Sequence, residues 1–191
     1  IKENNPHSWS EEWIRLGERA EKRAERSLSQ GHTVSARNAY LRAYTYLRWG
    51  GHSLSVKNPL RAENYHRFVA CFRKAAELME IYIEPIRVAW ELRGKDAFVP
   101  GYFMSPDNTG KKRPTVIAIN GGEMYPEDQY FWAGAAAVER GYNYVSITYE
   151  GQPAPPILYP DWSPVGPDAV NDLPGGPFGF MVDYALSRLE T

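Results

Sequence analysis

The sequence of 191 residues predicts an α/β protein that begins with an all-helical module. Apolar residues recur at helical spacing through the first 84 residues, and the spacing changes to a period of two at Glu84-Pro85. A strand, a helix and a strand joined by short loops follow in residues 115–148. We therefore expect a helical domain in residues 1–84 and part of an α/β domain in residues 85–191.

Three amphipathic helices are expected in the first domain. The first covers residues 8–29 and stops at Gln30-Gly31. The second begins at Thr33, which can cap it, and ends at Gly50-Gly51, while the third follows Asn58-Pro59. Pro at a helix start and Gly at a helix end support these limits.

The second domain opens with a predicted hairpin. Residues 86–92 alternate between apolar and polar, Gly94 can turn the chain, and residues 98–104 can return as the second arm. The apolar runs 115–119 and 144–148 are typical of strands that are buried on both faces of a parallel sheet.

Helical and irregular segments complete the second domain. Residues 126–140 are predicted to form a helix closed by Gly141. The proline-rich stretch 151–177 is predicted to be irregular, without helix or strand, and residues 178–189 to form a final helix.

Composition excludes several classes of function. The net charge is -1, and the basic residues of the first half alternate with Glu as on a solvated helix face, so we expect no nucleic-acid partner. No apolar run of about 18 residues is present, so we expect no membrane partner. A single cysteine, Cys71, is compatible with a reducing cytosol, and we expect a cytoplasmic location.

Asn120-Gly121-Gly122-Glu123 follows the first predicted buried strand and precedes a predicted helix. Glycines at this point let backbone N–H groups approach a ligand closely, and anions and developing oxyanions bind well there. The alternative is a tight turn that needs glycine for a positive φ. The residues alone leave both interpretations open.

The order of these parts resembles the start of an α/β-hydrolase. The segment 35–43 also resembles the N-terminal helical domain of one branch, which includes pseudooxynicotine hydrolases, fermentation-respiration switch proteins and fungal pigment hydrolases that shorten polyketide chains. The resemblance implies that the helices form a lid and that the N–H groups of Gly122 and Glu123 belong to an oxyanion hole.

Other parts of a hydrolase are missing from the sequence. No serine lies in the Gly-x-Ser-x-Gly frame that presents the nucleophile. All four histidines lie in the helical module, whereas the base of the resembled family comes late in the chain. Cys71, among Phe68, Val69 and Phe72, is interpreted as a buried apolar residue rather than a nucleophile. We expect the nucleophile and the base on a C-terminal half, present as a separate chain or a missing segment.

Three candidate substrate-binding residues, Tyr125, Tyr149 and Trp162, lie near the predicted strand ends. A fourth candidate, His66, lies on the third predicted helix. The Glu123 carboxylate could orient substrate, or it could be an acidic residue at a helix N-terminus. We expect no metal and no cofactor, and we expect the helices to cover the carboxyl edge of the sheet.

The predicted function is serine-dependent hydrolysis of a C–C, ester or related acyl bond in a small aromatic or polyketide-like molecule. Acyl transfer or cyclisation on the same fold is an alternative. A non-catalytic binding module is another, because the first two helices resemble a tetratricopeptide hairpin. A Rossmann-like phosphate site ranks last because Gly-x-Gly-x-x-Gly is absent. Homodimerisation is a further expectation.

Overall fold

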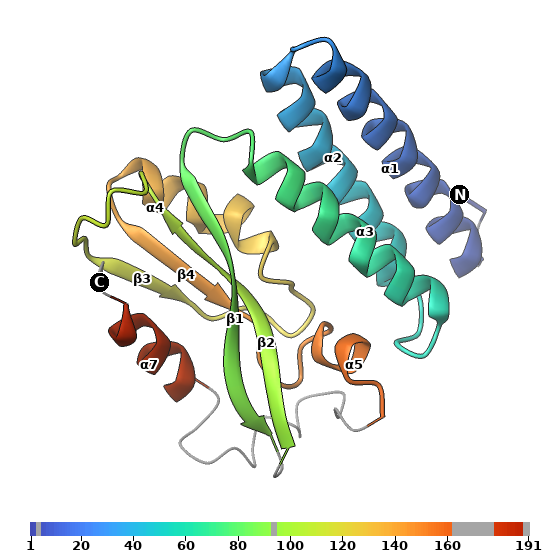
Figure 1. The fold of residues 1–191 in the computed structure, drawn as a ribbon. Helices are drawn as coiled ribbons and strands as arrows, with labels where there is room; N and C mark the ends of the chain where they lie inside the picture. The colour runs from blue at the N-terminus through green and yellow to red at the C-terminus, as the bar shows by residue number, and fades with distance from the viewer. Residues whose placement is uncertain (3–4, 93–94, 162–177, 189–191) are drawn as a thin grey trace. The chain divides into compact units, whose positions relative to one another are not determined.

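The computed structural model describes residues 1–2, 5–92, 95–161 and 178–188 (Figure 1). The chain forms two compact units, Ile1–Met79 and Glu80–Thr191. The regular structure described in the first unit is helical, and the second contains a mixed sheet with helices.

The helical unit consists of α1 (Pro6–Ser29), α2 (Thr33–His52) and α3 (Pro59–Ala76), as the periodicity predicts. The Asn58 side chain caps α3 by accepting a hydrogen bond from the Leu60 amide at 3.0 Å, and Pro59 takes the first helical position. The predicted cap of α2 is wrong. Thr33 is already helical, and His32, at the cap position, makes no capping hydrogen bond through its side chain.

Small residues let the first two helices approach each other closely. A Cβ placed on Gly17 would lie 2.6 Å from the Leu47 side chain, and one placed on Gly50 would lie 2.7 Å from the Ile14 side chain. Tyr44 from α2 packs edge-on against Phe68 of α3 at 5.4 Å between ring centroids. The core of this unit therefore combines close backbone contact with aromatic packing.

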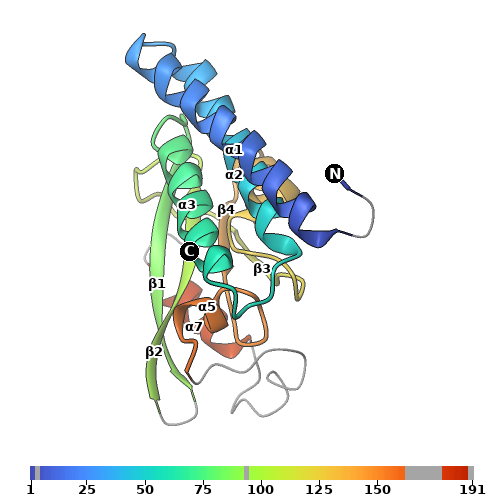
Figure 2. The ribbon, with the colours of Figure 1, turned by 90° about the vertical axis from the view of Figure 1, so that its right-hand side faces the viewer.

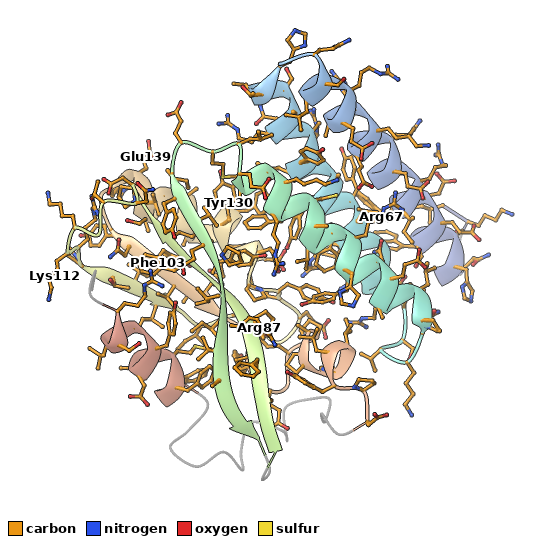
Figure 3. The ribbon with its side chains drawn as sticks, in the orientation of Figure 1. Arg67, Arg87, Phe103, Lys112, Tyr130 and Glu139 are labelled. Atoms are coloured by element: carbon orange, nitrogen blue, oxygen red, sulfur yellow. The ribbon has the colours of Figure 1, made fainter. Side chains whose placement is uncertain are left out.

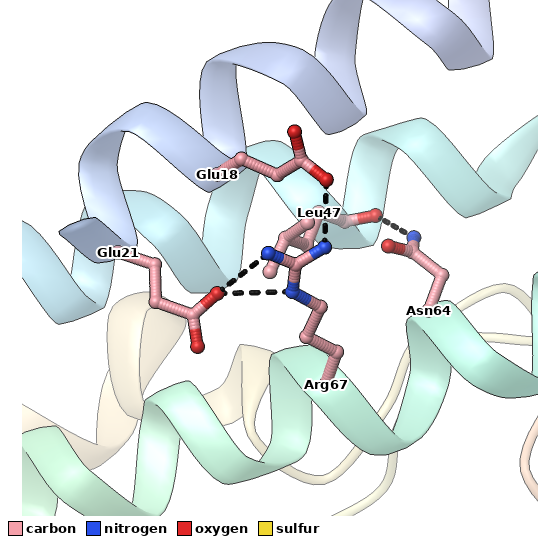
Figure 4. A network of polar contacts seen from close by, with 5 residues as sticks. All are labelled: Glu18, Glu21, Leu47, Asn64 and Arg67. Atoms are coloured by element: carbon pink, nitrogen blue, oxygen red, sulfur yellow. Dashed lines mark hydrogen bonds and ion pairs between the residues drawn. The ribbon is translucent and has the colours of Figure 1, made fainter.

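Polar contacts also join α3 to its two neighbours (Figure 4). Arg67 forms ion pairs with Glu18 at 3.0 Å and Glu21 at 2.9 Å on α1. The Asn64 amide donates to the Leu47 carbonyl on α2. Because the Arg67 side chain is 32% exposed, solvent screens its ion pairs, and each contributes on the order of 1 kcal/mol or less. Apolar packing dominates the stability of the unit.

The sheet of the second unit contains β1 (Tyr82–Leu92), β2 (Lys95–Ser105), β3 (Thr115–Ala118) and β4 (Asn143–Ile147) in the order β1-β2-β4-β3. β2 is antiparallel to both β1 and β4, whereas β3 is parallel to β4. The predicted hairpin is confirmed, although its turn residue Gly94 lies outside the described residues. Its strands extend well beyond the shorter β3 and β4 (Figure 2).

One face of this sheet carries an apolar cluster. Side chains from three strands, including Val99, Phe103 and Val145, pack with Met181 of α7 (Gly179–Ser187). Arg188 follows this helix, pairs with Glu84 at 2.8 Å and lies 3.8 Å over the ring of Phe103, which Figure 3 labels. The predicted final helix is therefore present and anchored to the sheet.

The opposite face is covered by η1 (Tyr130–Gly134), a π-helical turn, and α4 (Ala135–Glu139). A Cβ on Gly134 would lie 2.9 Å from the Met104 sulfur and 3.1 Å from the Gln129 carbonyl oxygen, so the π turn packs tightly on the strands. The prediction of a regular helix over 126–140 is thus wrong in its first part, because helical residues begin only at Asp128 and pass through the π turn.

Two further expectations need correction. The segment 151–177 includes a short helix, α5 (Pro155–Leu158), in its described part, with prolines at its start where they need no N–H partner. β3 is not buried on both faces: it lies at the edge of the described sheet, and Val116 is 39% exposed. β4, by contrast, is buried along its whole length.

Gly101 generates the first testable prediction. A Cβ at this position would lie 2.5 Å from the Ser146 carbonyl oxygen and 3.0 Å from the Ile147 Cα, both on β4. Gly101→Ala should force β2 and β4 apart and lower the free energy of unfolding by about 1–3 kcal/mol, the usual cost of overpacking. Urea denaturation followed by tryptophan fluorescence measures this. Gly122→Ala is the matched control, because its Cβ would meet no described atom within 4 Å. Equal midpoints for the two variants would contradict the prediction.

Cys71 provides a second prediction. Its side chain is fully buried in the helical unit, and burial raises the pKa of the thiol to about 12. This confirms its interpretation as an apolar core residue and disfavours a nucleophile. In the native protein at pH 8, Cys71 should not react with Ellman's reagent over minutes, whereas denaturation in guanidinium should expose the full thiol content. Rapid reaction of the native protein would contradict this.

Candidate functional site

The loops that follow β3 and β4 lie against each other, because both leave the same edge of the sheet. The Tyr149 hydroxyl donates to the Asn120 carbonyl at 2.7 Å. The Gln152 side-chain amide donates to the Gly121 carbonyl at 2.9 Å. Two successive carbonyl groups of the first loop are therefore fixed by side chains of the second.

Gln152 is the centre of this contact. Its side chain is 1% exposed, and its Oε1 accepts hydrogen bonds from the Thr148 hydroxyl at 2.8 Å and from the Tyr149 amide at 3.2 Å. Because the Tyr149 amide can only donate and the Gly121 carbonyl can only accept, the orientation of the Gln152 amide group is determined. Gln152 thus crosslinks the two loops in one defined geometry.

Gly121 and Gly122 are exposed at the tip of the first loop. Neither has a positive φ, so the interpretation of this pair as a turn that needs left-handed backbone is wrong. A Cβ on Gly121 would make only an ordinary contact with Met124, at 3.6 Å, and one on Gly122 would meet no described atom within 4 Å. Within the described residues, the fold places no demand for glycine at position 122.

A buried polar network supports the chain that follows this loop. Tyr102 on β2 donates to the Glu127 carboxylate at 2.8 Å, and Tyr144 on β4 donates to Gln129 at 2.5 Å. The Ser146 hydroxyl lies 3.1 Å from the Pro126 carbonyl oxygen. Burial raises the pKa of Tyr144 to about 12, so this hydroxyl remains a donor at neutral pH. Three strand hydroxyls thus hold residues 126–129 in place.

The structure brings together most, but not all, of the predicted site residues. Gly122 and Glu123 are exposed on the loop, and the largely buried Tyr125 and Tyr149 lie on and beside it. Burial also raises the pKa of Tyr149. His66 is exposed on α3, in the helical unit.

One predicted site residue cannot be placed, and one interpretation of another is wrong. Trp162 lies outside the described residues. Glu123 is not at a helix N-terminus, since helical residues begin only at Asp128, so that interpretation of its carboxylate is wrong. For the same reason, no helix dipole reinforces negative charge at this loop.

Sequence reasoning missed Gln152 and the strand hydroxyls. The signal that could have found Gln152 is a polar residue in the short loop after a buried strand, next to Gly151, whose φ of 90° in the structure marks a tight turn. The hydroxyls of Tyr102 and Tyr144 carry no such signal, because tyrosine in a strand is ordinary.

The described part of the chain contains no group of three or more His, Cys, Asp or Glu residues arranged to hold a metal ion. None of its described helices combines the length and the apolar character needed to cross a lipid bilayer.

Comparison with known proteins identifies hydrolases. The chain is 31% identical over 155 residues to the alpha/beta hydrolase xenA of Xenoacremonium sinensis, covering 80% of this chain and 36% of the relative. It is 30% identical to the alpha/beta hydrolase ucsC of Acremonium sp, covering 88% and 36%. For the alpha/beta hydrolase gkaG of Penicillium citrinum, the identity is 28%, with coverage of 100% and 43%. The chain thus spans well under half the length of these relatives. No family model matches the sequence.

A solved structure agrees with these relatives in fold. The 2,6-dihydroxy-pseudo-oxynicotine hydrolase superposes with a TM-score of 0.62 at 24% identity, covering 77% of this chain and 40% of that one. The antiparallel pairing of β2 with β4 also differs from the all-parallel Rossmann-like sheet of the last-ranked alternative. The fold is that of the N-terminal part of an α/β-hydrolase, and the sequence is similar to hydrolases of this fold.

Proposed function

We propose that this chain supplies the oxyanion hole and the lid of a serine-dependent hydrolase. The substrate is a small aromatic or polyketide-like molecule in which a C–C, ester or related acyl bond is cleaved. The observation that carries the proposal is Gly122, which is exposed at a strand end although neither its φ nor its described surroundings require glycine. A reacting carbonyl oxygen needs such access to a backbone N–H.

The helical unit is the proposed lid. Its support is the match to gkaG, which extends over 100% of this chain and therefore includes all three helices. A unit shared with hydrolases at this level favours a role in the same enzyme over a separate peptide-binding module.

The nucleophile and the base are proposed to come from a C-terminal half that pairs along β3. Val116 on that strand is 39% exposed and Ile119 just after it is 55% exposed, although both are β-branched apolar residues. A further strand beside β3 would cover such an edge, which otherwise invites pairing with other chains.

Substitution at Gly122 tests the oxyanion hole in the enzyme that includes the C-terminal half. Gly122→Val should reduce turnover of nitrophenyl acetate by about a hundredfold or more, the usual scale for losing one oxyanion donor. The branched side chain would occupy the space of the substrate oxygen, while its Cβ would meet no described atom within 4 Å. Glu123→Gln keeps the backbone N–H and serves as the control for the carboxylate. Full turnover by Gly122→Val would refute the assignment.

The division of the chemistry between the two halves is also testable. Residues 1–191 alone should neither hydrolyse nitrophenyl acetate nor become labelled by a fluorophosphonate, because this chain has no serine in the nucleophile frame. The enzyme that includes the C-terminal half should do both. Stoichiometric labelling of residues 1–191, measured by intact mass, would place the nucleophile in this chain.

A further inference from the structure

The direction of the Gly122 N–H is controlled by its peptide bond with Gly121. The chain contains no cis peptide among its described residues, so the Gly121 carbonyl and the Gly122 N–H point in opposite directions from one planar group. The carbonyl points to the Gln152 amide, at 2.9 Å. The N–H of Gly122 must therefore point away from Gln152.

The preceding peptide group is oriented in the same way. The Asn120 carbonyl accepts from the Tyr149 hydroxyl at 2.7 Å, which directs the Gly121 N–H away from the second loop. The Gly121 carbonyl also accepts a hydrogen bond from the Met124 amide at 3.0 Å, which closes a turn whose central residues are Gly122 and Glu123. The two contacts from the β4 loop and this turn hydrogen bond set the loop in one orientation.

Of the side chains that hold this loop, Gln152 is the one whose orientation is fixed by further hydrogen bonds. Its side chain is buried, its oxygen accepts from two donors, and its amide nitrogen remains to bind the Gly121 carbonyl. Without this donor, the peptide group between Gly121 and Gly122 would lose a partner that resists its rotation, because the loop tip is exposed.

We propose that Gln152 is a positioning residue that holds the Gly121–Gly122 peptide group so that the Gly122 N–H faces the substrate oxyanion. The inference rests on the proposed function, because it requires the Gly122 N–H to be an oxyanion donor. Gln152 itself touches neither the substrate nor the nucleophile. It acts through one peptide plane.

The experiment uses a fluorophosphonate as the probe and the enzyme that includes the C-terminal half. Gln152→Glu keeps the shape and both accepted hydrogen bonds but cannot donate to the Gly121 carbonyl when the new carboxyl group is ionised. At pH 8 its limiting labelling rate should fall about tenfold or more, while the half-saturating probe concentration stays unchanged. On acidification, the protonated carboxyl group of this variant can donate again. The rate relative to the parent enzyme should therefore recover toward pH 5.

Two further variants at or beside this contact serve as comparisons. Gln152→Met, which cannot donate at any pH, should stay slow throughout the range. If the Gln152 variants do not fold, Thr148→Val, which removes one hydrogen bond to the Gln152 oxygen, should slow labelling by a smaller factor. The titratable neighbours Glu123, Tyr149 and Glu150 are present in the parent and in all variants, so the pH profile of Gln152→Met shows their contribution when position 152 carries no carboxyl group.

Tyr159→Phe is the stability control. The Tyr159 hydroxyl accepts a hydrogen bond from the Phe98 amide and donates one to the Phe98 carbonyl oxygen on β2, both at 2.9 Å. This variant also loses a hydroxyl that joins the β4 loop to the sheet, but it should label at the parent rate.

The outcomes separate the two proposals. Labelling of Gln152→Glu at the parent rate at pH 8 would overturn the role of Gln152, as would a loss that does not recover with acidification and that equals the loss in Gln152→Met. A parent enzyme that is not labelled, or a Gly122→Val variant that is labelled at the parent rate, would instead overturn the proposed function.

Discussion

Strand β4 can lie beside β2 because residue 101 has no side chain. At this point the Ser146 carbonyl oxygen occupies the place that a Cβ of residue 101 would take, at 2.5 Å. The pairing of β2 with β4 joins the antiparallel hairpin to the parallel pair, and β4 is buried along its whole length between its neighbours. From that position, β4 directs Tyr144 and Ser146 to the segment 126–129 and leads into the loop that contains Gln152. The candidate site therefore depends on one close backbone approach.

Much of the fold could be predicted from local patterns. The three helices follow from apolar spacing and from the Asn58-Pro59 start signal, and the hairpin follows from alternation. These features depend on neighbours in sequence, which is why a single chain reveals them. The exposed β3 edge could not be predicted in the same way, because an apolar β-branched run has the same composition whether or not a further strand covers it.

The candidate site was predictable only in part. The position of Gly121-Gly122 after a buried strand was evident, but the reason for the glycines was not, since only the backbone angles exclude the turn interpretation. The contact between Gln152 and Gly121 spans 31 residues and joins a side chain to a carbonyl, so no periodicity encodes it. The π turn at Tyr130–Gly134 likewise coincides with a tertiary contact, the close packing of Gly134 against Met104, and the helical pattern of the sequence contains no sign of it.

The anchoring of α7 affects how the sheet is made during translation. The apolar face that includes Val99, Phe103 and Val145 is complete once β4 has been synthesised, yet Met181 and Arg188, which cover it, come much later in the chain. At about 5–20 residues per second, the ribosome takes seconds to add them. Until α7 packs against it, this face of the sheet stays uncovered, so any folding intermediate that forms the sheet before α7 docks exposes apolar surface.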